Sequence, residues 1–188
     1  MNITTTFKYA ITACCLSFTA QANETSLLAD VDAGYNRIAT IAKSLWDYAE
    51  VGYQEQKSSA LLQNELNTAG FSVETGVADI PTAFIASYGS GGPTIAILAE
   101  FDALPGINQN NLPERSPIEG KNAGHACGHN LFGAGSVQAA ISIRNWLELT
   151  DTPGTIRLYG TPAEEGGSGK VYMVREGLFD DVDFVIHW

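Results

Sequence analysis

The chain has 188 residues, of which 45% are hydrophobic and 16% are charged, a composition typical of a globular protein with a substantial core. Ten basic and 21 acidic residues give a formal net charge of −11. This balance counts against nucleic acid partners and against binding to an anionic membrane surface, because both depend on clustered Lys and Arg. We therefore expect no nucleic acid partner and no stable membrane association.

The N-terminal residues 1–22 differ in character from the rest of the chain. One cation, Lys8, precedes an apolar run over residues 9–18, and the sequence Ala20-Gln21-Ala22 matches an A-x-A cleavage pattern. The apolar run is too short to span a membrane comfortably, so a cleaved secretory signal peptide is favoured over a retained anchor. We therefore expect the mature chain, residues 23–188, in the periplasm or outside the cell.

Hydrophobic periodicity predicts alternating helices and strands along the mature chain. Two helices are expected within residues 25–69, interrupted near Gly52 and closed by Gly70. Further helices are expected at residues 131–149 and 169–177. Strands are expected at residues 71–75, 82–89, 94–99, 154–160 and 182–188. A long loop rich in Gly, Pro and Asn covers residues 104–129, and loops of this length are usually functional.

This order of elements predicts an α/β fold, with a mostly parallel sheet and helices on both faces. In such sheets ligands bind outside the carboxyl ends of the strands. The three histidines of the chain, His125, His129 and His187, all fall at this expected edge. So does Cys127, which is the only cysteine of residues 23–188.

The residue types at this edge indicate a metal site. Cys127, His129, Glu165 and His187 are ligand types suited to Zn, Mn or a similar divalent ion. A metal also explains a lone thiol in an exported chain, because coordination holds it as a thiolate and protects it from oxidation. The spacing Cys127-Gly128-His129 allows two ligands to reach one site from a glycine corner.

The adjacent carboxylates Glu164 and Glu165 suit two separate roles in a hydrolase. A metal-dependent hydrolase needs a carboxylate ligand and a free carboxylate that accepts a proton from water and delivers it to the leaving amine. We assign Glu165 as the ligand and Glu164 as the base. Asp102, which follows a buried strand, is expected to orient a ligand imidazole.

Other interpretations of these residues remain open at this point. Cys127 with His125 or His129 is also compatible with a nucleophile–base pair. Cys127 by itself is compatible with an inert thiol, His187 with an ordinary strand residue, and the acidic pair with a solvated loop. The sequence GGSGK at residues 166–170 lacks the glycine spacing of a phosphate loop.

Four motifs together resemble the amidohydrolase branch of the aminoacylase/carboxypeptidase metallopeptidase family. They are AEFDALPG, GHACGHNLFGAGSVQAA, GTPAEEGGSGKVYMVREGLFDDVD and IHW. The resemblance implies a zinc-peptidase-like catalytic domain with two divalent metal ions, Zn or Mn. It implies that Cys127 bridges the ions, that His129, Glu165 and His187 complete much of their coordination, and that Glu164 is the general base.

The resemblance implies a metal-dependent amidohydrolase that cleaves an amide bond to an amino acid, in an aroyl or acyl amino acid or a dipeptide. It also implies a homodimer or a paired subunit for the full-length form. The family carries a second domain, used for dimerisation and substrate capping, and a later metal-binding His, and neither occurs in this sequence. We therefore interpret residues 23–188 as the N-terminal part of the catalytic domain, and we expect this chain alone to be inactive. A non-catalytic fragment is the alternative.

Overall fold

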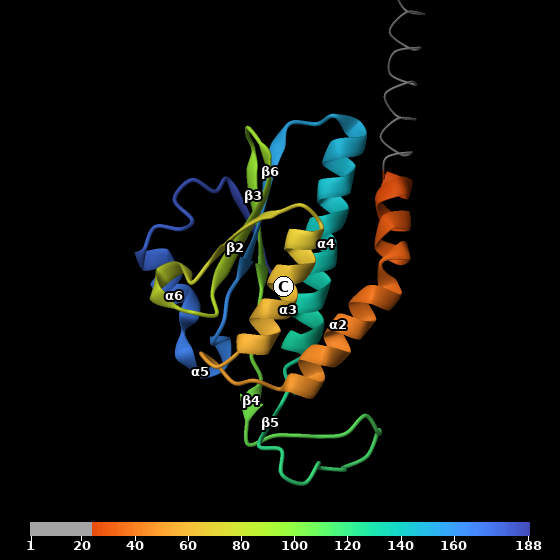
Figure 1. Cartoon of the computed structure of the whole chain (residues 1–188), viewed down its shortest axis with the longest axis vertical. Coiled ribbons are helices and arrows are strands. Elements are labelled where there is room, and N and C mark those ends of the chain that lie inside the picture. The colour runs from red at the N-terminus through yellow and green to blue at the C-terminus, as the bar shows by residue number, and fades with distance from the viewer. Residues whose placement is uncertain (1–23) are drawn as a thin grey trace, which may run out of the picture.

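A computed structural model describes residues 24–188, and the expected signal peptide, residues 1–22, lies outside the described residues (Figure 1). Residues 24–33 are helical and turn at Gly34 into the next helix. The helices are α2 (Tyr35–Tyr48), α3 (Gln56–Thr68), α4 (His129–Thr150), α5 (Glu164–Gly167) and α6 (Gly169–Arg175), with a short 3-10 turn η1 (Val77–Asp79). The strands are β1 (Ser72–Thr75), β2 (Phe84–Ser90), β3 (Thr94–Ala99), β4 (Leu104–Pro105), β5 (Ala123–Gly124), β6 (Gly154–Gly160) and β7 (Phe184–Ile186).

The predicted α/β class is confirmed, but the central sheet is mixed rather than mostly parallel. Its strand order is β1-β2-β6-β3-β7. β3 pairs in parallel with β6 and β7, whereas β2 pairs antiparallel with β1 and β6. The reason is the three-residue turn at 91–93, which reverses the chain between β2 and β3. Since β6 lies between these two strands, it must run parallel to one and antiparallel to the other.

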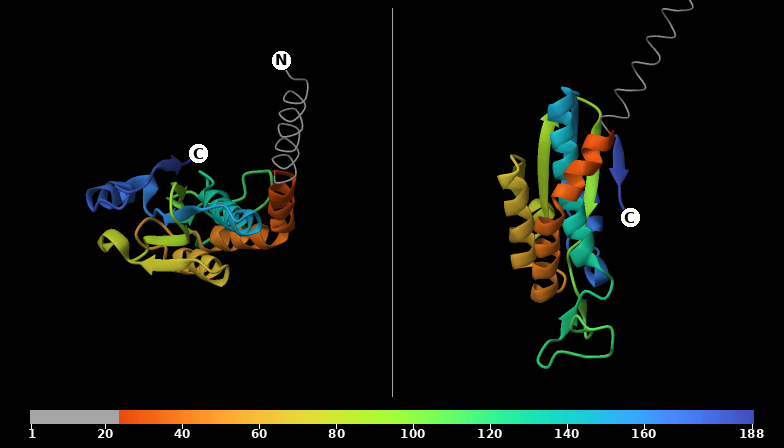
Figure 2. Two further views of the ribbon diagram at one scale, coloured as in Figure 1. Left: turned by 90° about the horizontal axis from the view of Figure 1, so that it is seen from above. Right: turned by 90° about the vertical axis from the view of Figure 1, so that its right-hand side faces the viewer.

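Alternating side chains of the sheet build a core on each of its faces. Ile97 and Ala99 of β3 pack with apolar residues of α2, α3 and α4 in the larger cluster. Ala96 and Leu98 of the same strand face the opposite way and pack in a smaller cluster with Met173 of α6. This period of two places helices on both faces, as the sequence pattern predicts (Figure 2).

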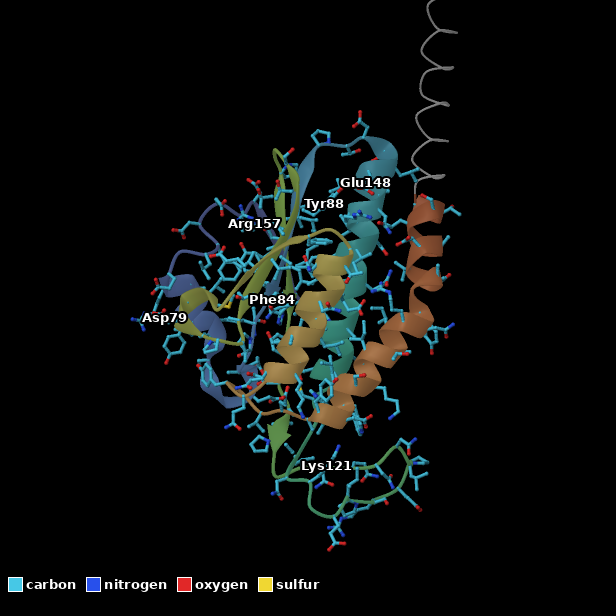
Figure 3. The ribbon with its side chains drawn as sticks, in the orientation of Figure 1. Asp79, Phe84, Tyr88, Lys121, Glu148 and Arg157 are labelled. Atoms are coloured by element: carbon cyan, nitrogen blue, oxygen red, sulfur yellow. The ribbon has the colours of Figure 1, made fainter. Side chains whose placement is uncertain are left out.

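The long loop expected at residues 104–129 carries structure of its own. β4 and β5 pair antiparallel at its base, and the backbone N–H of Gly106 donates to the Asn122 carbonyl at 2.6 Å. Lys121, labelled in Figure 3, donates through Nζ to the carbonyl of Asp47 at the end of α2, at 2.9 Å. The loop is therefore tied to the body of the domain just before residues 125–129.

The two ends of the sheet differ in what they present. Tyr88 of β2 and Glu148 of α4, labelled in Figure 3, are hydrogen-bonded to each other at one end. The opposite end collects the carboxyl ends of β3, β6 and β7 and the first residue of α4. Within residues 24–188, none of the helices combines the length and the apolar character needed to cross a membrane.

Candidate active site

The candidate site lies at the carboxyl ends of the parallel strands. β3 leads directly into Glu100 and Asp102, and β6 leads into α5, which carries Glu164 and Glu165. His129 is the first residue of α4, and Gly128 before it has φ +100°, a left-handed conformation that favours glycine. The sharp turn at Gly128 brings the loop that contains Cys127 onto the same edge of the sheet.

His129 is the residue around which the site is arranged. Its ring is buried, and Nδ1 lies 3.0 Å from Oδ1 of Asp102 and 3.1 Å from the Asp102 carbonyl oxygen. Its Nε2 lies 2.9 Å from Oε2 of Glu100 and 3.8 Å from Oε2 of Glu164. Burial lowers the pKa of His129, but hydrogen bonds to Asp102 and Glu100 outweigh it and raise this pKa to about 10. Without metal, the imidazole is therefore protonated between carboxylates.

Two sets of side chains place potential ligand atoms within 4.8 Å of one another. The first set is Cys127, His129 and Glu165, and the second is Glu100, His129 and Glu164. Both sets combine an imidazole with carboxylate oxygens, and the first adds a thiol, which together form a donor set suited to Zn and related ions. His129 belongs to both sets, so the two sets share one imidazole.

One atom of the first set needs a partner. Oε1 of Glu165 is buried and has no hydrogen-bond partner among the described residues. Burial raises the pKa of this carboxyl, as expected for a group whose charge lacks solvent. Buried carboxylate oxygens are normally hydrogen-bonded or bound to a cation. Since Cys127 and His129 lie next to this oxygen, a divalent ion fits the site.

The structure brings the predicted site residues together, although His187 joins them indirectly. Cys127, His129 and Glu165 meet in one set, and Asp102 contacts Nδ1 of the His129 ring. His187 belongs to neither set; its Nε2 lies 3.0 Å from Oε1 of Glu100. His187 nevertheless lines a cavity of about 380 Å³ together with Glu100, Cys127, His129 and Glu164.

Glu100 is the site residue that the sequence pattern left unassigned. Its buried carboxylate contacts the side chains of His129, His187 and Lys170. Burial acts to raise the pKa of Glu100, but hydrogen bonds from these three residues lower it to about 2. One feature of the sequence could have identified Glu100 as a site residue. Glu100 directly follows the apolar run 94–99 and lies two residues before Asp102. Lys170 of the GGSGK sequence is thus paired with a carboxylate.

The arrangement does not favour a cysteine nucleophile. Nε2 of His125 lies 3.0 Å from the carbonyl of Leu45, and burial lowers the pKa of His125 to about 4. Both nitrogens of His129 face carboxylates. Cys127 is exposed at the surface of the site. Partial desolvation, opposed by His129 and reinforced by Glu165, raises the pKa of its thiol. A cysteine nucleophile needs the opposite, an imidazole base and a lowered thiol pKa.

Comparison with known proteins defines the class. Residues 96–188 match the model of peptidase family M20/M25/M40. The resemblance that the sequence motifs indicate is therefore confirmed for this part of the chain, which matches the M20 family model. A solved dinuclear metal-binding peptidase of the M20 family from Bacillus subtilis superposes with a TM-score of 0.68 at 27% identity, covering 82% of this chain and 42% of that one.

The chain is also similar in sequence to two hydrolases of known activity. The chain is 48% identical over 160 residues to one subunit of the p-aminobenzoyl-glutamate hydrolase of Escherichia coli (strain K12), covering 84% of this chain and 33% of that protein. It is 31% identical over 168 residues to the Xaa-Arg dipeptidase of Mus musculus, covering 82% of this chain and 35% of the dipeptidase. The chain thus spans about a third of the length of the curated relatives it matches.

Proposed function

We propose that this chain forms the metal-binding core of an amidohydrolase that cleaves an amide bond to an amino acid. The observation that carries the proposal is the convergence of Cys127, His129 and Glu165 within 4.8 Å around a buried carboxylate oxygen without a partner. The likeness to a p-aminobenzoyl-glutamate hydrolase and to a dipeptidase supports aroyl or acyl amino acids and dipeptides as substrates.

The proposed cofactor is a pair of divalent ions, Zn or Mn. Cys127, His129, Glu165 and His187 would hold them, with Glu100 beside them. When bound, such ions polarise the scissile carbonyl and make water more acidic. The dinuclear peptidase of the same family supports two ions rather than one.

Three acidic residues of the site have separate proposed roles: Glu164 as general base, Glu165 as metal ligand and Asp102 as the group that orients His129. The Glu164 side chain is 42% exposed and lines the cavity, which supports a role as the base that takes a proton from the attacking water and returns it to the leaving amine. The Glu165 side chain is only 15% exposed and serves as a ligand. Asp102 accepts from Nδ1 of His129 and keeps Nε2 directed toward the carboxylates.

Metal removal and restoration tests this function. The full-length enzyme that contains this chain is purified, its Zn and Mn content is measured by elemental analysis, and hydrolysis of p-aminobenzoyl-glutamate and of N-acyl amino acids is assayed before and after chelation. We expect chelation to abolish turnover and Zn or Mn to restore it. Turnover that survives in protein shown to be metal-free would overturn the proposal. Two bound metals without any turnover would favour the non-catalytic alternative.

The Escherichia coli relative is named as one of a hydrolase's subunits, which supports a homodimer or a paired subunit for the whole protein, and sedimentation of the purified protein tests this. Export to the periplasm or the medium is proposed on the N-terminal pattern of residues 1–22 alone.

A further inference from the structure

The short helix α5, which carries Glu164 and Glu165, has little to hold it in place by itself. It is a single turn of four residues, and the residues on either side, Ala163 and Ser168, both have left-handed backbone conformations with φ of 58° and 55°. Non-glycine residues in this conformation are strained, and they persist only where surrounding structure holds them. The orientation of the two glutamates must therefore depend on contacts from elsewhere.

Asp102 supplies one such contact, because its Oδ2 accepts from the backbone N–H of Glu165. The connector between α2 and α3, residues 49–55, supplies the contacts at the two ends of α5. At the start of α5, the backbone N–H of Ala163 donates to Oε1 of Glu55 at 2.8 Å. At the end of α5, the Tyr53 hydroxyl donates to the carbonyl of Gly167. The connector therefore holds both ends of a helix that lies more than 100 residues later in the chain.

The connector and α5 pack closely against each other at two glycines. A Cβ on Gly52 would lie 2.9 Å from Cα of Ala163, and a Cβ on Gly167 would lie 2.5 Å from Cε2 of Tyr53. Both distances are below any normal contact, so glycine at each position is what permits the approach. Side chains larger than hydrogen would push the connector and α5 apart.

The connector is itself firmly placed. Glu55 is fully buried, and its second oxygen accepts from Oγ1 of Thr82 at 3.0 Å. The backbone N–H of Ala103 donates to the carbonyl of Glu50 at 2.8 Å, which joins the connector to the segment that carries Asp102. The connector thus links the two segments that supply Asp102 and the glutamate pair.

We propose that Tyr53 and Glu55 are positioning residues for the glutamate pair, which they orient toward Cys127 and His129 through the two ends of α5. This inference rests on the proposed metal-dependent function. Glu55 acts as a hydrogen-bond acceptor for Ala163, and its negative charge is not required. A glutamine at position 55 would keep that acceptor, whereas alanine would remove it.

Cobalt binding tests this inference without relying on turnover. The probe is Co(II) alone, titrated into metal-free protein and followed by its absorption, including the thiolate-to-cobalt band that reports on Cys127. The variants are Glu55→Ala, Glu55→Gln and Tyr53→Phe. Tyr35→Phe, at an exposed tyrosine, is the matched control, and Ile156→Val in the β6 core controls for reduced stability alone.

We expect Glu55→Ala and Tyr53→Phe each to weaken Co(II) binding about 3- to 10-fold, the effect of losing one hydrogen bond. Glu55→Gln, Tyr35→Phe and Ile156→Val should bind as the unmodified protein does. If Glu55→Ala does not fold, Tyr53→Phe carries the test, because it keeps the aromatic ring and removes only the hydroxyl.

Two results would overturn the inference while leaving the metal site intact. One is unchanged Co(II) affinity in Tyr53→Phe and Glu55→Ala. The other is equal weakening in Glu55→Gln or in Ile156→Val, which would show a general effect of charge or stability. A Glu165→Gln variant that binds Co(II) as the unmodified protein does would instead overturn the proposed metal site, and the positioning role with it.

Discussion

Asp102 joins His129 to Glu165 through its two carboxylate oxygens. Oδ1 lies 3.0 Å from Nδ1 of His129, and Oδ2 accepts a hydrogen bond from the backbone N–H of Glu165 at 2.9 Å. Asp102 is itself almost completely buried. One side chain therefore sets both the ring orientation of one proposed ligand and the backbone position of another.

Replacement of Asp102 by asparagine should weaken metal binding about 10- to 100-fold, the usual effect of losing a group that orients a metal-binding histidine. The asparagine amide group can serve only one of the two contacts as an acceptor. The dissociation constant of Co(II) or Mn(II) for the metal-free protein measures the effect. Asp79→Asn is the matched control, because Asp79 is not part of either ligand set and has φ 58°, which asparagine tolerates. Equal affinities in both variants would contradict the role of Asp102.

The two adjacent glutamates should respond differently to the same substitution. In the full-length enzyme, Glu164→Gln is expected to retain metal and lose about 10²- to 10⁴-fold in turnover, the usual contribution of a general base. Glu165→Gln is expected to lower metal content, because its buried oxygen is the one that lacks a partner. Elemental analysis and turnover are measured on the same preparations. Near-normal turnover in Glu164→Gln would show that the roles are wrongly assigned.

The stability of the domain should depend on pH through Glu55. Burial raises the pKa of Glu55 above its ordinary value of 4.5, against hydrogen bonds from Ala163 and Thr82 that lower it. The folded state therefore keeps this proton to a higher pH than the unfolded state does. The stabilisation is complete below pH 4.5 and is lost as the pH rises through the higher folded pKa, at about 1.4 kcal/mol for each pKa unit.

Glu55→Gln should remove this dependence and leave the other groups unchanged. Urea unfolding of both proteins between pH 4.5 and pH 8 measures the difference in the free energy of unfolding. The unmodified protein should lose stability relative to Glu55→Gln as the pH rises. Glu114→Gln, at an exposed loop position, serves as the control. Parallel curves for the unmodified protein and Glu55→Gln would contradict a raised pKa.

Processing of the N-terminus gives an independent prediction about the chain. Expression with its own first 22 residues should yield a mature protein that begins at Asn23, because Ala20-Gln21-Ala22 matches the cleavage pattern. N-terminal sequencing of protein from the periplasm and from the medium measures this. Changing Ala20 and Ala22 to larger residues should block cleavage. An uncleaved, membrane-bound product from the unmodified chain would favour the retained anchor.

Local sequence patterns were sufficient for the order of the longer helices and of the strands of the central sheet, and for the edge where the candidate site lies. The apolar run at 94–99 and the helical spacing after residue 129 depend on residues close in the chain, so they can be recognised without the fold. The same holds for Cys127-Gly128-His129 and for the pair Glu164 and Glu165, where neighbouring residue types already indicate the chemistry. The expected alternation of helices also placed them on both faces of the sheet.

Tertiary structure alone decided how these pieces meet. β6 enters the sheet between β2 and β3, antiparallel to one and parallel to the other, and no local pattern reports this position. The contacts of Glu100 with Lys170 and His187 span 70 and 87 residues, and the contact of Glu55 with Ala163 spans 108. Such contacts form only when distant segments pack. The hydrogen bonds of a buried polar group depend on what surrounds it after folding, and its own residue type does not determine them.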